Sequence, residues 1–238
     1  MSTFKLQQFA ILQSVNAMKV CTDSLVFGAL TPVENADRVL DIGGGTGILS
    51  LMAAQRGAKH ISCVELMPAS SREACDNVAN SPWSNRITVF NRDINDFDSE
   101  SLFDVIISNP PFFDNHLKND DALRNTARHT DTLSYQQLLE KAKELLTPNG
   151  LISLLLPVHT VEVINDICHT LQLVITKRCD LITMSGGVAK VTILEISNQS
   201  DSNSAQTPAV NTITVYSSHQ QYSEQSARLL KDFLLRFA

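Results

Sequence analysis

The sequence predicts a doubly wound α/β fold, with seven mostly parallel strands in one sheet and helices on both faces. Three observations predict it. An apolar run at residues 36–42 leads through a glycine-rich turn into a helical stretch, as in the first strand–helix unit of a nucleotide-binding sheet. A second apolar run, residues 60–65, ends in an acidic residue about twenty positions after the glycines. A third run, residues 103–108, ends at Asn109 and two prolines, which mark a turn after a buried strand.

The chain before the sheet is expected to form an N-terminal extension over the active site, residues 1–30. Residues 4–13 alternate well enough for a short strand or hairpin arm, and residues 24–30 are apolar and helical in pattern. Thr22 and Asp23 precede this helix, and either is well suited to cap it. They would also place polar groups at a site entrance, and the sequence leaves both roles open.

The turn after the first strand carries a Gly-x-Gly-x-Gly spacing at Gly43, Gly45 and Gly47, with Asp41 just before it. Glycines at this point let a ligand approach backbone N–H groups near a helix N-terminus. A dinucleotide fingerprint would have its third glycine at the position of Ile48. The spacing is more typical of S-adenosylmethionine sites than of NAD sites.

Two carboxylates follow the next two strands. Glu65 ends the strand at residues 60–65, where a carboxylate accepts hydrogen bonds from both ribose hydroxyls of a nucleoside cofactor. The alternative for Glu65 is a solvated strand end. A helix at 68–80 and a strand at 86–90 lead to Asp93, which sits where such folds accept the adenine amine of the cofactor. An ordinary loop aspartate is the alternative there.

The run Asn109, Pro110, Pro111 and Phe112 predicts methyl transfer to a planar amino nitrogen. Such a nitrogen is a poor nucleophile because its lone pair is delocalised into the ring. The side-chain carbonyl of Asn109 and the backbone carbonyl of Pro110 can accept both amine protons and favour the pyramidal nitrogen that attacks. The two prolines stiffen the turn, and Phe112 offers a flat face on which a flipped-out base can stack. Taken alone, the run also fits a rigid loop.

A polar connection at residues 113–132 follows without clear periodicity, and we expect it to be a mobile substrate loop. Three of its cations are candidates for RNA contacts: Lys118, Arg124 and Arg128. Nearby aspartates partly cancel them, so a solvated charged loop is the alternative. His129 is not expected to act as a catalytic base, because the chemistry described above does not need one.

The second half completes the sheet. The pattern predicts helices at residues 134–146 and 158–170, and strands at residues 151–156, 171–177 and 189–196, the last of which closes the main sheet. The polar stretch 198–210, rich in Ser, Asn and Gln, predicts a surface insertion. A short strand at 212–216 and a helix at 223–236 end the chain, with Leu229 and Phe233 at the helical spacing of a docked amphipathic helix.

The composition allows one domain over residues 1–238, because 43% of the chain is hydrophobic and can form a substantial core. The five cysteines are odd in number and form no Cys-x-x-Cys pair, which argues against a disulfide framework or a zinc site and favours a reducing cytoplasm. No segment reaches the roughly 18 uninterrupted apolar residues of a membrane span. A net charge of −6 implies that any RNA site is local, since phosphate contacts normally draw on a basic surface.

Several stretches carry a resemblance to a known family: residues 8–9, 17–23, 41–47, 109–113, 127–134, 222–223 and 230–234. The family is that of bacterial class I methyltransferases that modify the N6 amine of the adenine just 3′ of the anticodon in a valine tRNA. The glycine loop and the Asn-Pro-Pro-Phe run are shared across the superfamily, whereas residues 18–23 and 128–131 are closer to family-specific. The chain departs from the usual pattern at Cys21, where glycine is usual, and again at Ser24. Val15 and Asn16 replace the usual basic residue before this stretch.

The resemblance implies a Rossmann-like class I methyltransferase fold, S-adenosylmethionine as cofactor and methylation of adenine 37 in tRNA(Val). It implies that the following residues line the cofactor pocket: Thr22, Asp23, Asp41, Gly43, Gly45, Glu65, Asp93 and Asn109. Asn109 would also recognise the amine, with Phe112 stacking on the base. We expect a cytoplasmic monomer that acts on tRNA and needs neither a metal nor a membrane.

The same chemistry also fits other acceptors: guanine N2 of ribosomal RNA, an adenine in DNA, or the side-chain amide of a glutamine in a protein. Relatives that act on the amide carry a separate helical N-terminal domain, for which some thirty residues before the first sheet strand are too few. A further alternative is a cofactor-binding RNA partner that has lost catalysis. The intact Asn109 and glycine loop argue against it.

Overall fold

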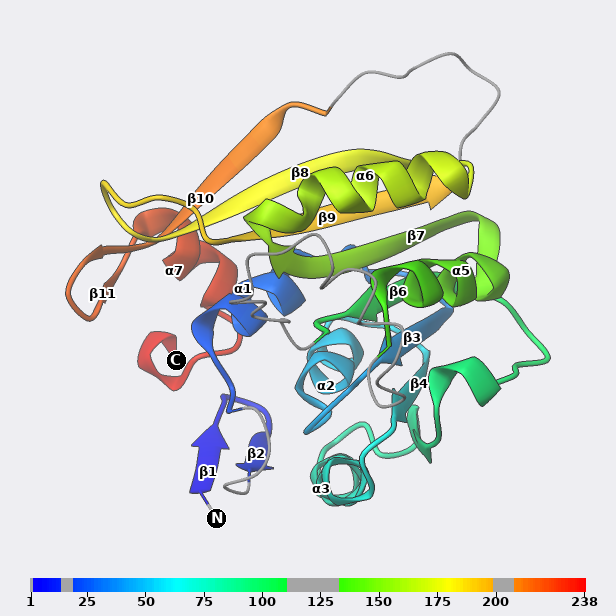
Figure 1. The fold of residues 1–238 in the computed structure, drawn as a ribbon. Helices are drawn as coiled ribbons and strands as arrows, with labels where there is room; N and C mark the ends of the chain where they lie inside the picture. Colours follow the sequence, from blue (N-terminus) through cyan, green and yellow to red (C-terminus); the bar gives the residue numbers. More distant parts are fainter. Residues whose placement is uncertain (1, 14–18, 111–132, 199–207) are drawn as a thin grey trace.

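The computed structural model describes residues 2–13, 19–110, 133–198 and 208–238. Their strands form a two-stranded hairpin and one nine-stranded sheet with the order β11-β10-β8-β9-β7-β6-β3-β4-β5. Helices cover both faces of the large sheet (Figure 1). The chain therefore forms a three-layer α/β structure.

The elements have the following bounds. The hairpin is β1 (Ser2–Lys5) and β2 (Ala10–Gln13), and the sheet contains β3 (Arg38–Ile42), β4 (His60–Glu65), β5 (Ile87–Asn91), β6 (Phe103–Ser108), β7 (Leu146–Pro157), β8 (Leu173–Met184), β9 (Val191–Asn198), β10 (Val210–Ser218) and β11 (Gln221–Tyr222). The α-helices are α1 (Thr22–Leu30), α2 (Ile48–Gln55), α3 (Pro68–Ala79), α5 (Tyr135–Leu145), α6 (Val161–Thr170) and α7 (Glu224–Leu230). Short 3-10 turns are η1 (Ile94–Asp96), η3 (Val158–Thr160) and η4 (Leu235–Phe237).

The doubly wound α/β fold is confirmed. Strands β5, β4, β3, β6 and β7 are parallel neighbours, and β9 lies antiparallel between β7 and β8. Both faces are buried, so alternate residues of one strand enter different cores. In β6, Val105 and Ile107 join the core under α1, α2, α3 and α7, whereas Ile106 joins the core under α5 and α6.

The C-terminal part of the sheet differs from the prediction. The strand at 189–196 does not close the sheet, because β10 pairs parallel with β8 and β11 pairs with β10, giving nine strands rather than seven. The short strand predicted at 212–216 is confirmed within β10, where Ile213 and Val215 are buried, but its alternation does not reveal that it pairs with β8. Residues 199–207 of the predicted insertion lie outside the described residues, and its two ends belong to β9 and β10.

The predicted helix at 223–236 is too long, since α7 ends at Leu230. Beyond it, the backbone turns to the N-terminal hairpin. The backbone N–H of Gln7 donates to the carbonyl of Phe233 at 2.8 Å, and Leu234 bridges to Leu6. Backbone groups that would extend the helix are used in these long-range bonds instead.

A buried side chain also joins the hairpin to the body of the molecule. Asn77 of α3 accepts a hydrogen bond from the backbone N–H of Leu12 at 2.8 Å and donates to the carbonyls of Leu12 and Thr46. Since Thr46 belongs to the glycine turn, this contact joins the N-terminal residues to the loop that follows β3. The expectation of a strand or hairpin arm at 4–13 is confirmed as a hairpin.

Candidate active site

Four parallel strands end side by side at one edge of the sheet, and the candidate residues follow these ends. Ile42 of β3 is in register with Val64 of β4 and with Ser108 of β6, and Glu65 of β4 is in register with Asn91 of β5. In doubly wound sheets, ligands bind outside the carboxyl ends of the strands. We refer to this edge as the carboxyl edge.

The glycine turn needs its glycines for two different reasons. Gly43, Gly45 and Gly47 have φ of +71°, +56° and +80°, a left-handed region that other residues rarely adopt. Gly44 has ordinary φ, but a Cβ there would lie 2.2 Å from the Sγ of Cys63. A Cβ on Gly43 or Gly45 would meet nothing within 4 Å, so the outer side of the turn is open.

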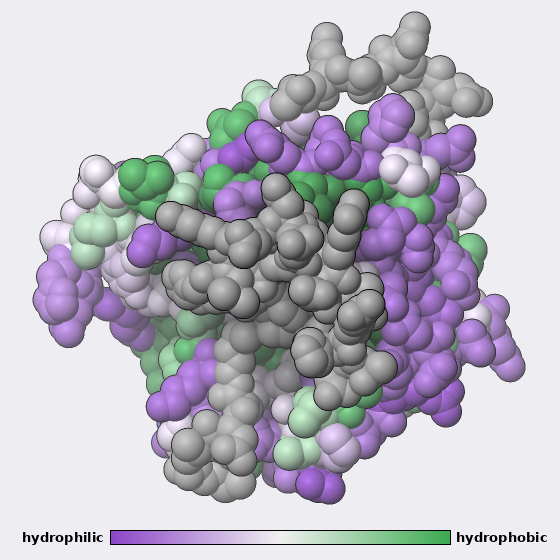
Figure 2. Space-filling view, viewed as in Figure 1, coloured by the Kyte–Doolittle hydropathy of each residue, from purple (hydrophilic) through white to green (hydrophobic). Residues whose placement is uncertain are grey.

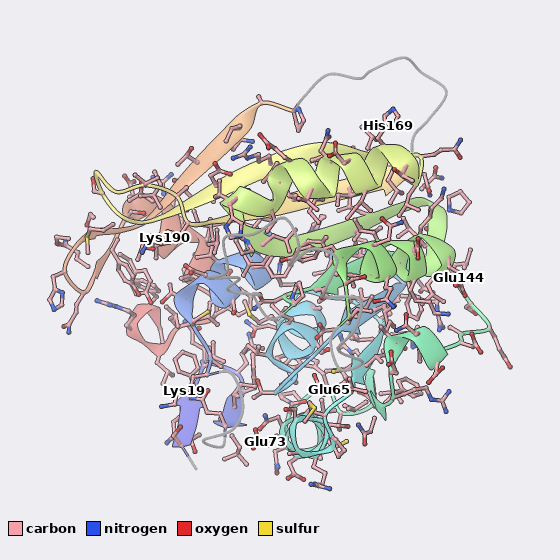
Figure 3. The ribbon with its side chains drawn as sticks, viewed as in Figure 1. Lys19, Glu65, Glu73, Glu144, His169 and Lys190 are labelled. Atoms are coloured by element: carbon pink, nitrogen blue, oxygen red, sulfur yellow. The ribbon has the colours of Figure 1, made fainter. Side chains whose placement is uncertain are left out.

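Glu65 holds the glycine turn from the neighbouring strand. Its two carboxylate oxygens accept backbone N–H groups, one from Gly45 at 2.9 Å and the other from Met67 at 2.8 Å. The side chain lies at the end of β4 between α2 and α3 (Figure 3), and only 7% of the residue is exposed. The alternative of a solvated strand end is therefore wrong. Each oxygen retains a lone pair with which to accept a further donor.

Asp41 is a buried carboxylate with one unused oxygen. Its Oδ2 accepts the hydroxyl of Ser50 at 2.6 Å and the backbone N–H of Ser50 at 3.1 Å. Its Oδ1 is buried and accepts no hydrogen bond from a described residue. Burial raises the pKa of Asp41 from 3.8 to about 6, the bonds from Ser50 lower it, and the charge of Glu65 raises it further. A buried acceptor without a donor indicates a place for a ligand donor group.

Asn109 follows β6 directly and is half-buried. Its Nδ2 donates to the Oγ of Ser24, a buried residue on α1, at 3.1 Å. The Sγ of Cys21 lies 3.0 Å from the same Oγ. In this arrangement the amide nitrogen is engaged, and the carbonyl oxygen accepts no hydrogen bond from a described residue. Pro110 is described and buried.

Thr22 and Asp23 belong to the first turn of α1, and neither caps it. Cys21 is the N-cap residue and no side chain makes a cap hydrogen bond, so the capping expectation is wrong. The Oγ1 of Thr22 instead lies 2.8 Å from the phenol oxygen of Tyr216 on β10. Asp23 is half-buried, and burial raises its pKa.

Asp93 follows β5 and has a local role. Its Oδ1 accepts the backbone N–H of Asn95 at 2.9 Å and the side-chain N–H of the same residue at 3.0 Å, which caps η1. The residue is half-exposed at the carboxyl edge. The expected contact with a cofactor adenine stays a prediction.

The described residues fit a nucleoside cofactor at the carboxyl edge. The open outer side of the glycine turn, the buried Oδ1 of Asp41 and the remaining lone pairs of Glu65 are the features such a ligand needs. Within the described part of the chain, no group of three or more His, Cys, Asp or Glu side chains is placed to hold a metal ion. Among the same residues, no helix is both long enough and apolar enough to span a membrane.

Comparison with known proteins identifies the family. Residues 19–175 match the family model described as Methyltransferase small domain. A tRNA1(Val) (adenine(37)-N6)-methyltransferase of Shewanella baltica is 38% identical over 239 residues, which cover 98% of this chain and 99% of the relative. The enzyme of the same name from Bacteroides fragilis is 35% identical over 236 residues and 98% of each chain. The chain belongs to this methyltransferase family.

Solved structures of other methyltransferases have a similar fold. A methyltransferase from Pyrococcus furiosus superposes with a TM-score of 0.58 at 20% identity, covering 80% of this chain and 89% of that chain. A ribosomal protein L11 methylase from Lactobacillus delbrueckii subsp. bulgaricus gives a TM-score of 0.51 at 18% identity, covering 75% and 78%. At these identities the likeness shows the fold alone. The predicted class I methyltransferase fold is confirmed, and the chain is an enzyme of this class.

Four predicted residues of this methyltransferase lie outside the described residues: Phe112, Lys118, Arg124 and Arg128. Three contacts of the site, in turn, were not predicted. Ser50 bonds Asp41, Ser24 bonds Asn109 and Tyr216 bonds Thr22. Of these partners, only Ser24 carried a signal, as a departure from the family pattern.

Proposed function

We propose that this chain transfers a methyl group from S-adenosylmethionine to N6 of adenine 37 in tRNA1(Val). Relatives with this name, similar over nearly the whole chain, support the substrate. The observation that carries the proposal is Asn109, whose amide nitrogen is bound to Ser24 and whose carbonyl oxygen is left to accept an amine proton.

The cofactor would lie along the carboxyl edge. The Oδ1 of Asp41 and the carboxylate of Glu65 would accept its donor groups, and Gly43 and Gly45 would let it approach the backbone. Asp93 would accept the adenine amine, with Thr22 and Asp23 lining the pocket. When bound, S-adenosylmethionine supplies an activated methyl group on a sulfonium centre.

The protein would act mainly by positioning the acceptor. The Asn109 carbonyl and the backbone carbonyl of Pro110 accept the two amine protons, which localises the nitrogen lone pair and favours the pyramidal geometry of the transition state. Because Pro110 is buried and Asn109 is bound to α1, both carbonyls are held by the fold before the substrate arrives. Phe112 would stack on the base, and Lys118, Arg124 and Arg128 would contact the RNA.

The test begins with wild-type protein, labelled S-adenosylmethionine and a tRNA1(Val) transcript, followed by nucleoside mass spectrometry. We expect N6-methyladenosine at position 37. Asn109→Ala should abolish turnover while leaving cofactor affinity within a few-fold of wild type, because it removes the amine acceptor and leaves Asp41, Glu65 and the glycine turn unchanged. Asn211→Ala is the matched control, since Asn211 is an exposed amide on β10.

Two results would refute the proposal. One is methylation of a different acceptor, such as guanine N2 or a protein amide, with the tRNA left unmodified. The other is an Asn109→Ala variant as active as wild type, which would remove the proposed role of this side chain while leaving the cofactor site intact.

A further inference from the structure

Aromatic side chains and one arginine gather where the C-terminal strands and turn meet. Tyr216 of β10 and Tyr222 of β11 have ring centroids 4.8 Å apart, and Phe237 of η4 meets Tyr222 edge-on at 5.7 Å. The guanidinium carbon of Arg236 lies 5.0 Å from the centroid of Tyr222 and 5.6 Å from that of Phe237. The three rings are half-buried and Arg236 is exposed. We call these four residues the C-terminal platform.

The platform lies at the same edge of the sheet as the candidate active site. Strand β9 is antiparallel to both β7 and β8, so β8 runs in the same direction as β7 and β6, and β10 is parallel to β8. The end of β10 that carries Tyr216 therefore points to the carboxyl edge, as does the end of β6 before Asn109. Tyr216 bonds Thr22 at 2.8 Å, and Ser24, two residues further on, bonds Asn109. The first turn of α1, which is about 5 Å long, therefore lies between Tyr216 and Asn109.

The guanidinium of Arg236 has no carboxylate partner among the described residues. Its only described hydrogen bond runs from Nη1 to the carbonyl of Gln220, at 3.3 Å. Lys19 and Lys190 are also exposed and form no ion pair within the described part of the chain. Figure 3 labels both lysines on the left of the view, the side on which Figure 1 shows the C-terminus. Three cations without an ion-pair partner in the described part of the chain, Arg236, Lys19 and Lys190, therefore belong to this side of the molecule.

The opposite side of the candidate site is acidic. Residues 93–102, between β5 and β6, contain four Asp or Glu residues and no Lys or Arg. This segment lies to the right in Figure 1, where hydrophilic side chains dominate the surface in Figure 2. A polyanion that reaches Asn109 would be repelled by this side and attracted to the other, because charges near a surface act over about one Debye length, roughly 8 to 10 Å.

Packing of the C-terminus accounts for the rings but not for the arginine. The three aromatic residues bury apolar area against one another and would do so without a cation. Arg236 adds an exposed, permanently charged fork that stacking on two rings holds in place. A guanidinium fixed in this way loses little entropy when it forms a bidentate contact with phosphate.

We propose that the C-terminal platform is a contact surface for the RNA substrate, with Arg236 binding a backbone phosphate and Lys19 and Lys190 flanking it. The proposal rests on the proposed function, because it takes tRNA as the polyanion that must reach Asn109. It places the RNA over β10, β11 and η4 and away from the segment between β5 and β6.

The test measures the affinity of the full chain for tRNA1(Val) transcript by filter binding at several salt concentrations. Arg236→Ala should weaken tRNA binding about five- to tenfold at low salt, with cofactor affinity unchanged. The slope of the logarithm of the binding constant against the logarithm of the salt concentration should become shallower by about 1, the loss expected for one phosphate contact. Arg236→Lys, which keeps the charge, should recover most of the slope. Arg228→Ala is the control, because Arg228 is exposed on nearby α7 but already paired with Glu224.

A second variant guards against a folding defect. Lys190 is exposed in the turn before β9, so Lys190→Ala should fold normally and still weaken tRNA binding by two- to threefold. Wild-type affinity and salt slope in both Arg236→Ala and Lys190→Ala would overturn the proposal, leaving the platform as packing only. Failure of the proposed function is separate: it would appear as wild-type protein that binds tRNA through Arg236 but yields no N6-methyladenosine.

Discussion

The amide of Asn109 has two chemically different ends, and the proposed role of this residue requires that the oxygen face the substrate amine. Ser24 accepts from the Asn109 nitrogen at 3.1 Å, and the thiol of Cys21 reaches the same hydroxyl at 3.0 Å. Cys21 and Ser24 are two positions at which the resemblance described above led us to expect a departure from the family pattern. A residue without a side-chain hydroxyl at position 24 could make no such bond.

Ser24→Ala tests the bond directly. Loss of one hydrogen bond costs about 1 kcal/mol, so we expect kcat to fall about five- to tenfold as the amide of Asn109 samples its flipped orientation. The KM for S-adenosylmethionine should stay within about twofold, because no cofactor contact is removed. Steady-state kinetics with tRNA1(Val) transcript provide both parameters, and thermal unfolding checks the fold. An unchanged kcat would show that Asn109 is oriented without Ser24.

The buried charge of Asp41 should appear in the pH dependence of stability. Its folded pKa of about 6 exceeds the unfolded value of 3.8, so the folded state binds the proton more tightly. Stability should therefore fall as pH rises from about 4 to about 6 and then level off, by up to about 3 kcal/mol at about 1.4 kcal/mol per pKa unit. The side chain of the Asp41→Asn variant cannot ionise, so its stability should lack this fall between about pH 4 and about pH 6.

Urea unfolding of both proteins without cofactor at pH 4.5 and pH 7 isolates this effect. The variant should gain stability relative to wild type at the higher pH, because only wild type then carries an ionised buried carboxylate. A difference between the two proteins that does not change with pH would mean that Asp41 titrates as it does in the unfolded chain.

At the scale of elements, the sequence predicted those that strong local signals define. The strand β3, the glycine turn and α2 follow from one apolar run and three glycines that need left-handed φ. Helix α5 begins where the pattern placed it, because Ser134 and Gln137 form a capping box. The strand predicted at 212–216 is confirmed within β10, but its parallel pairing with β8 was not predicted, and the end of α7 was placed too late, since the backbone partners of both segments lie far along the chain.

The candidate site likewise contains residues that the sequence predicted and contacts that it did not. Asp41, Glu65 and Asn109 were predicted together because parallel strands bring their carboxyl ends to one edge, a rule that needs only the order of strands. The bond from Asn109 to Ser24 joins residues 85 apart, and that from Thr22 to Tyr216 joins residues 194 apart. Such pairs depend on how α1 packs against the sheet, which local sequence does not encode.

At the scale of the whole molecule, hydrogen bonds join the N-terminal hairpin to the segment that follows α7. Gln7 donates from Nε2 to the carbonyls of Lys231 at 2.6 Å and Leu234 at 2.9 Å, and its backbone N–H donates to Phe233. The contact fixes the N-terminal hairpin against the segment that carries the platform. It also satisfies carbonyls after α7 that have no helical partner.

Gln7→Ala should therefore lower the free energy of unfolding by about 1 to 3 kcal/mol, the sum of two side-chain hydrogen bonds at about 1 kcal/mol each with some carbonyls left less satisfied. The neighbouring Gln8→Ala is the matched control, because Gln8 is exposed and makes no side-chain hydrogen bond within the described residues; its effect should stay within about 0.5 kcal/mol. Urea unfolding of the three proteins gives the comparison. Equal stability of the two variants would mean that the ends are joined by apolar packing around Leu6 and Leu234, and that the polar contact adds nothing measurable.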